Sequence, residues 1–178
     1  MRRRLITRLA FPLLVAAAAC ENDGSPTNPS TVTQMAGTWG YNARLNSVSG
    51  GECVGSDFQA IIGATDSGTL SITQSGGSLT ATQTSDAGGG SCMYSGTASS
   101  SSFTLNLTRC DGSQVFRDFP CSNGARRDIE FITNPIEGTV NGNSMTATSV
   151  ETYNLYSAGT TNRVGTLTLS ASMTATKR

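Results

Sequence analysis

The residues whose chemistry stands out in this sequence are its five cysteines, and the chain contains no histidine. Cys20 follows a run of four alanines, whereas Cys53, Cys92, Cys110 and Cys121 are spread over the middle of the chain. The missing histidine removes the commonest general base and the commonest metal ligand. Because serine–histidine and cysteine–histidine catalysis both need that base, we expect no enzymatic activity and no cofactor.

The first 19 residues decide which environment these thiols meet. Four arginines within residues 2–8 precede an apolar run over residues 9–19. A basic segment, a short apolar run and small residues at its end are the layout of a secretory signal peptide. The run is too short to span a bilayer, which takes roughly 20 apolar residues. We therefore predict an exported protein with a signal peptide over residues 1–19.

The residues around Cys20 narrow this prediction. The sequence Ala-Ala-Ala-Cys at residues 17–20 resembles the lipobox of bacterial lipoproteins, in which the cysteine is acylated and becomes the first residue. The resemblance implies a lipid anchor at Cys20, and several acyl chains hold a protein stably at a membrane. Glu21 stands where an aspartate retains such proteins at the inner membrane of some bacteria, which favours the outer membrane over the inner. A plain secreted protein is the alternative.

The other four cysteines would then meet an oxidising compartment, where an even set forms disulfides. No Cys-x-x-Cys spacing indicates a zinc site, and we expect no metal. The favoured pairing is Cys53–Cys92, joining two glycine-rich loops, with Cys110–Cys121, closing the longest loop. The rival is Cys92–Cys110 with Cys53–Cys121, because the first pair would face each other in a hairpin turning at Ser101.

Composition limits the number of domains and the class of partner. The segment 20–34 is rich in Pro, Ser, Thr and Asn and predicts a flexible tether, which leaves residues 35–178 as one folded domain. Beyond residue 19 the chain carries 8 basic and 12 acidic residues. Nucleic-acid binding needs a basic face, so we expect no nucleic-acid partner.

The apolar residues alternate with polar ones, which predicts strands and no helices. Expected strands cover residues 39–45, 58–62, 70–72, 79–81, 92–95, 103–107, 126–133, 136–140, 145–155 and 164–176. Residues 111–125 read as the longest loop. Asn141-Gly142 is the strongest hairpin signal, and Pro135 should end a strand or mark an edge.

A Gly-Thr pair recurs within these strands at Gly68, Gly96, Gly138 and Gly165. The first three precede a turn rich in glycine or serine and a returning strand, as in a sheet built of sequential hairpins. Closure of such a sheet removes its exposed edges. We therefore predict an all-β fold, an antiparallel up-and-down barrel of 8 to 10 strands, with a two-sheet sandwich as the alternative.

The start of the first strand, Ala-Gly-Thr-Trp at residues 36–39, resembles the Gly-x-Trp signature of lipocalins and their calycin relatives. The resemblance implies an eight-stranded barrel whose tryptophan closes one end, often beneath the cationic side chain of an arginine from the last strand. Arg163, Lys177 and Arg178 are the candidates for that cation. Residues 69–76 also resemble a hairpin of bacterial barrel lipoproteins.

An eight-stranded barrel can hold one small ligand, and we expect a small apolar one. The candidate lining consists of the inward-facing aromatic and apolar residues Trp39, Tyr41, Phe58, Phe103, Leu105, Phe131, Tyr153 and Leu169. The alternative is that these side chains fill the interior as core.

The stretch 110–126 is a second candidate site, because Phe116, Arg117 and Phe119 are of the types that dominate protein contacts. A disulfide would preorganise it for a protein partner in the envelope, in the manner of a protease inhibitor. Alternatively the two phenylalanines fold back over the barrel mouth. The sequence thus predicts non-enzymatic binding at the cell envelope, with a purely structural surface lipoprotein as the remaining alternative.

Overall fold

The structure is a computed structural model that describes residues 32–50, 53, 59–88, 90–112, 114–121 and 123–178. Within them it is all-β. The strands are β1 (Gly37–Ser49), β2 (Thr65–Ser75), β3 (Ser78–Ser85), β4 (Ser91–Ala98), β5 (Ser102–Cys110), β6 (Val115–Pro120), β7 (Arg126–Thr133), β8 (Ile136–Asn141), β9 (Ser144–Ser157) and β10 (Arg163–Lys177).

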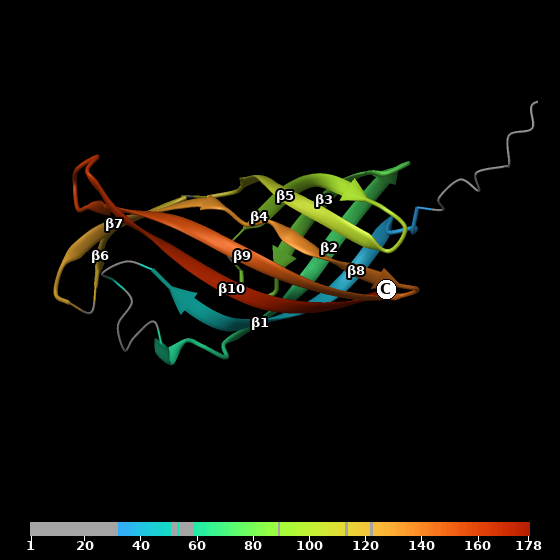
Figure 1. Cartoon of the computed structure of the whole chain (residues 1–178), viewed down its shortest axis with the longest axis horizontal. Coiled ribbons are helices and arrows are strands. Elements are labelled where there is room, and N and C mark those ends of the chain that lie inside the picture. Colours follow the sequence, from blue (N-terminus) through green and yellow to red (C-terminus); the bar gives the residue numbers. More distant parts are fainter. Residues whose placement is uncertain (1–31, 51–52, 54–58, 89, 113, 122) are drawn as a thin grey trace, which may run out of the picture.

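Eight of these strands close into an antiparallel barrel (Figure 1). Neighbouring strands pair in the order β10-β1-β2-β3-β4-β5-β8-β9, and β9 pairs back with β10. Strands that follow each other in the chain are neighbours in the ring, except that β6 and β7 are inserted between β5 and β8. The predicted up-and-down barrel is confirmed, and its closure replaces the alternative of a sandwich.

Strands β7 and β8 behave as one long strand with a break. The first half of β9 pairs with β8, and its second half pairs with β7. Asn134 and Pro135 separate the two partners, as expected for a residue that lacks a backbone N–H. Strand β6 pairs with the outer side of β7, so that β6, β7 and the ends of β9 and β10 project beyond the barrel (Figure 1).

The end of the barrel nearest Trp39 is closed by packed side chains. Trp39 is fully buried in the main core, and its Nε1 donates a hydrogen bond to the Met35 carbonyl oxygen at 2.8 Å. Lys177 lies opposite Trp39 in the pairing of β1 with β10, and its Nζ is 5.5 Å from the indole centroid. Of the three candidates, Lys177 is the one that supplies a cation to the Trp39 ring, a lysine where the resemblance implies an arginine.

The recurring Gly-Thr pairs mark places where backbones approach closely. A Cβ atom on Gly96 would collide with the Thr104 carbonyl oxygen of β5, and one on Gly68 with the Thr84 carbonyl oxygen of β3. Glycine at such positions allows a strand to bend sharply. At Gly68, Gly96 and Gly138, the repeat seen in the sequence thus places a residue without a Cβ atom where the backbone of a neighbouring strand comes close.

Two of the expected elements are wrong. The strand predicted over 58–62 is not present: residues 59–60 are helical and residues 61–63 form a turn, with Ile62 N donating to the Gln59 carbonyl oxygen. Phe58 lies outside the described residues. The loop predicted over 111–125 contains β6. The pairing of β6 with β7 shifts in register between Phe116 and Phe119, where Asp118 has a φ of 54°. This irregularity interrupts the alternation of apolar and polar residues by which a strand is recognised in a sequence.

A second, smaller core lies beneath the projecting strands. It consists of the buried residues Val48, Cys53, Cys121, Ile129, Leu155 and Leu167. At the other end, contacts with the barrel begin inside the segment predicted as a tether, because Val32 packs against the main core and Thr33 N donates to the Ser99 carbonyl oxygen. In the part of the chain described here, no helix has the length and apolar character needed to cross a membrane.

Candidate functional site

The barrel interior changes from apolar to polar toward its mouth, the end opposite Trp39. Inward positions near Trp39 carry buried Leu70, Leu79 and Leu105. Toward the mouth, the inward positions of β2, β3, β4 and β9 carry the polar residues Asp66, Gln83, Ser85, Tyr94, Glu151 and Tyr153. They line a cavity of about 280 Å³, close to the lower limit of small-molecule sites, roughly 300 Å³. We call it the mouth cavity.

Asp66 is fixed in this cavity by two hydroxyl groups. Tyr41 Oη, from β1, donates to Asp66 Oδ2 at 2.6 Å, and Ser85 Oγ, from β3, donates to Asp66 Oδ1 at 2.6 Å. Burial, reinforced by the hydrogen bond to Asp66, raises the pKa of Tyr41 to about 12. Tyr41 therefore remains a proton donor to the carboxylate near neutral pH.

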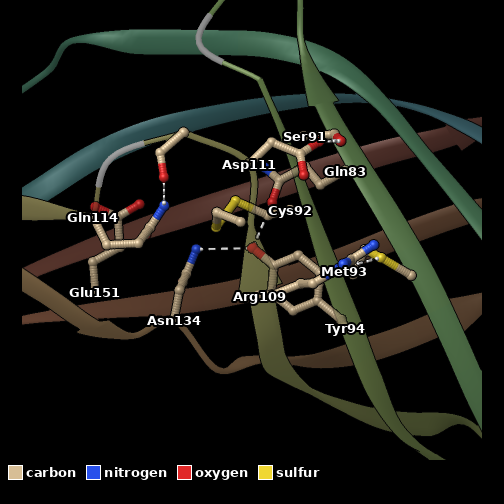
Figure 2. The surroundings of a disulfide bond; sticks show 12 residues. Gln83, Ser91, Cys92, Met93, Tyr94, Arg109, Asp111, Gln114, Asn134 and Glu151 are labelled. Atoms are coloured by element: carbon tan, nitrogen blue, oxygen red, sulfur yellow. Dashed lines mark hydrogen bonds between the residues drawn. A yellow bond between two sulfur atoms is a disulfide. The ribbon is translucent and has the colours of Figure 1, made fainter.

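A second group is centred on the Tyr94 hydroxyl (Figure 2). This hydroxyl donates to Gln83 Oε1 at 2.8 Å and accepts from Asn134 Nδ2 at 3.2 Å. Asn134 is only 7% exposed, and its other polar atom, Oδ1, has no hydrogen-bond partner. A buried acceptor without a donor costs roughly 1–3 kcal/mol, so the site contains an unused hydrogen-bonding position.

A third group is formed by the end of β9. Tyr153 Oη donates to Glu151 Oε2 at 2.7 Å, and the Tyr153 ring packs against Phe131 with 5.2 Å between centroids. Burial, followed by the negative charge of Glu151, raises the pKa of Tyr153 and of Tyr94. The mouth cavity therefore combines carboxylates with protonated phenols and aromatic faces.

A second cavity of about 220 Å³ adjoins the first inside the barrel. The two cavities share Asp66, Gln83, Asn134 and Glu151. The rest of its wall is mostly apolar, formed by Ala43, Leu45, Ala64, Ile136, Leu169, Ala171 and Met173. We call it the apolar cavity, and the four shared residues separate it from the mouth cavity.

The disulfides correct the pairing that the sequence favoured. Cys92 bonds to Cys110 and Cys53 bonds to Cys121, which is the rival pairing. Cys92 and Cys110 are register partners on β4 and β5 and also line the mouth cavity (Figure 2). The favoured pairing is wrong because the chain between Cys92 and Cys110 forms a hairpin, which places the two residues opposite each other.

The structure divides the eight residues predicted to line the interior. Trp39, Phe103 and Leu105 are buried in the main core and line neither cavity. Tyr41, Phe131 and Tyr153 line the mouth cavity, Leu169 lines the apolar cavity, and Phe58 lies outside the described residues. The interior is thus filled core at one end and hollow at the other.

Sequence reasoning missed the residues that the two cavities share. Asp66, Gln83 and Glu151 continue the inward period of their strands beyond the last apolar residue. The sequence signal that could have identified these residues is the inward-facing period of two, continued from the apolar positions to the polar ones. Asn134 carries no such signal, because it lies in the break between β7 and β8.

The three residues of the second predicted site do not form one surface. Phe116 is 56% exposed at the rim of the mouth cavity. Phe119 packs against the second core beside the Cys53–Cys121 disulfide. Of the two phenylalanines, Phe116 is the one placed at the barrel mouth.

Arg117 forms an ion pair with a buried carboxylate of β7. Its Nη1 lies 2.6 Å from Asp128 Oδ2, and Asp128 is 2% exposed. Asp128 also accepts hydrogen bonds from the backbone N–H groups of Asp118 and Gly159. The Asp118 N–H first, and then the Arg117 guanidinium, lower the pKa of Asp128. Asp128 therefore joins β6, β7 and the β9–β10 turn.

The charge of the mouth cavity is one-sided. Asp66, Asp111 and Glu151 are among its lining residues, and no lysine or arginine of the described chain is. Anywhere in the described part of the chain, no group of three or more His, Cys, Asp or Glu is arranged to hold a metal ion.

No family model matches the sequence, and comparisons with curated proteins and with solved structures found no match.

Proposed function

We propose that this protein is an exported, lipid-anchored barrel of the cell envelope that binds a small ligand and does not catalyse a reaction. The observation that carries the proposal is the pair of cavities at the barrel mouth, which meet at four polar residues. One of these, Asn134, is buried with an unused acceptor. Convergent polar groups at a preformed hollow are typical of ligand sites.

The residue types around the cavities support binding over catalysis. The chain has no histidine, and the mouth tyrosines and carboxylates already hydrogen-bond to one another in pairs. A hydroxyl does lie next to a carboxylate where Ser85 donates to Asp66, but the chain has no histidine to act as the general base. The ligand that we propose carries polar groups beside apolar ones, because polar and apolar side chains together form the combined wall.

The N-terminal segment supports export and anchoring on sequence grounds alone. Residues 1–19 have the layout of a signal peptide, and Cys20 follows a lipobox-like run. The two disulfides are consistent with an oxidising compartment. As in the sequence analysis, Glu21 favours the outer membrane.

Native mass spectrometry of the full chain, released from a bacterial envelope in a mild detergent, tests the binding function. We expect an additional mass that is lost on denaturation and is the same in two chemically different detergents. A covalent anchor at Cys20 would remain after denaturation and is thereby separated from the ligand. A bare native mass, with none of a panel of small polar and apolar molecules binding, would contradict the proposal.

A bare native mass would favour the second candidate, a protein partner at β6. This strand is at the edge of the sheet formed by the described residues, and Phe116 is exposed on it. An edge strand offers unpaired backbone groups to which an extended segment of another protein can add.

A further inference from the structure

The mouth cavity presents hydrogen-bond acceptors that lack donors. The Asn134 Oδ1 atom has no partner although the side chain is 93% buried, and its Nδ2 is already used on Tyr94 (Figure 2). Asp66 and Glu151 each accept from a tyrosine, but a carboxylate can accept about four hydrogen bonds. What this cavity lacks is therefore a donor.

The charge around these acceptors selects the kind of donor. Three carboxylates line the cavity, and no basic residue of the described chain does so. Two arginines of the projecting strands are engaged in ion pairs, Arg117 with Asp128 and Arg126 with Asp118. Arg109, beside the lining residue Cys110, is exposed and donates to Met93 Sδ. A neutral donor would satisfy Asn134 but would leave the negative charge uncompensated, whereas a cation satisfies both.

The aromatic residues at the mouth add a second attraction for a cation. Tyr41, Tyr94, Tyr153 and Phe131 all line the cavity. The raised pKa values of the three tyrosines keep their rings neutral near neutral pH. The face of a neutral aromatic ring attracts an ammonium group.

The apolar cavity determines what the cation is attached to. It begins at the same four residues, Asp66, Gln83, Asn134 and Glu151, and continues toward Leu169 and Met173. A group bound by Glu151 and Asn134 can therefore extend a short hydrocarbon arm along this apolar wall. Burial of each methylene there contributes roughly 0.8 kcal/mol.

We propose that the barrel binds an amphiphilic organic cation, whose ammonium group lies between Asp66, Asn134 and Glu151 and whose apolar arm enters the apolar cavity. This inference rests on the proposed small-ligand function and specifies its ligand class. It differs from the sequence-based expectation of a wholly apolar ligand.

Calorimetric titration of the full chain with three probes of equal chain length tests it: hexylammonium chloride, hexan-1-ol and sodium hexanoate. We expect hexylammonium to bind at least about tenfold more tightly than hexan-1-ol, since a hydrogen bond to a charged group contributes more than a neutral one. Hexanoate should bind least. The preference should decrease in about 1 M salt, where the Debye length is about 3 Å.

A matched pair of variants locates the site. Glu151→Gln removes one negative charge at the cavity, and Glu137→Gln removes one from the exposed face of β8. We expect the first to weaken hexylammonium about tenfold or more and the second to leave its affinity unchanged. Should Glu151→Gln not fold, Asp66→Asn is the second cavity variant and has the same expected loss.

The outcomes separate the two proposals. Equal or tighter binding of hexan-1-ol or hexanoate would overturn the cation and leave small-ligand binding standing. Loss of affinity in Glu137→Gln as large as in Glu151→Gln, or displacement of hexylammonium by calcium chloride at equal ionic strength, would also overturn it. If none of the three probes binds and the native mass is bare, both proposals fail.

Discussion

Asp66 and Glu151 owe their place in the barrel to the period of two along their strands. Asp66 precedes Gly68 and Leu70 on the inward face of β2, and Glu151 follows Ala147 on that of β9. Because side chains on a strand alternate between its two faces, these carboxylates must lie on the inward face with the apolar residues. There each carboxylate accepts a hydrogen bond from a tyrosine. The two phenols thus stabilise carboxylates that the strands place in a half-buried position.

Tyr41 gives this arrangement a pH dependence that can be measured. Its pKa rises from 10.0 in the unfolded chain to about 12 in the folded protein. The contribution to stability is therefore complete below about pH 10 and is lost as the pH rises toward 12, because the unfolded chain releases the proton first.

We expect the urea concentration at the midpoint of unfolding to decrease as the pH is raised from 10.0 to about 12. In Tyr41→Phe this decrease should be less steep. The slope that remains in the variant belongs to Tyr94 and Tyr153, whose pKa values are also raised. Equal slopes in the two proteins would show that Tyr41 is not held protonated by the fold.

At the level of strands, the features encoded by neighbouring residues could be predicted from the sequence. The contacts between residues far apart in the chain could not. The hairpin is signalled by the dipeptide Asn141-Gly142, and the break between strands is signalled by Pro135. Both features are present in the structure. The pairing of Cys53 with Cys121 joins residues 68 positions apart, and no pattern near either cysteine encodes it. The same holds for Asn134, whose role depends on Tyr94, 40 residues away.

The two disulfides close loops of very different length, and their removal should differ accordingly. Cys92–Cys110 spans 18 residues between adjacent strands, whereas Cys53–Cys121 spans 68. Constraint of the unfolded chain predicts losses of roughly 3 kcal/mol for the first and roughly 4 kcal/mol for the second. Double cysteine-to-serine variants, compared in reversible urea unfolding, measure both.

The larger loss should therefore come from Cys53→Ser with Cys121→Ser, although Cys92 and Cys110 lie closer to the cavities. The reverse order would mean that native contacts around the hairpin disulfide, and not the entropy of the unfolded chain, dominate its contribution.

At the level of the whole molecule, the proposed membrane attachment depends on a single cysteine. Cys20 precedes the described residues, while the other four are paired. We expect Cys20→Ser to abolish incorporation of labelled palmitate and to release the protein from the membrane fraction, with the barrel still folded. The paired variant Ser30→Ala, on the same segment, should retain both label and membrane attachment. Unchanged palmitate labelling in Cys20→Ser would contradict anchoring at this residue.

The position of the first described residues has a consequence for orientation. Val32 and Thr33 contact the closed end of the barrel, on the side of Trp39, and Lys177 near the C-terminus lies there too (Figure 1). From Cys20 to Val32 a fully extended chain reaches at most about 40 Å. Acyl chains at Cys20, as proposed above, would thus tether the barrel by its closed end, at most about 40 Å from the lipid. The attachment point and the mouth cavity would then lie at opposite ends of the barrel, which leaves the mouth clear of the tether.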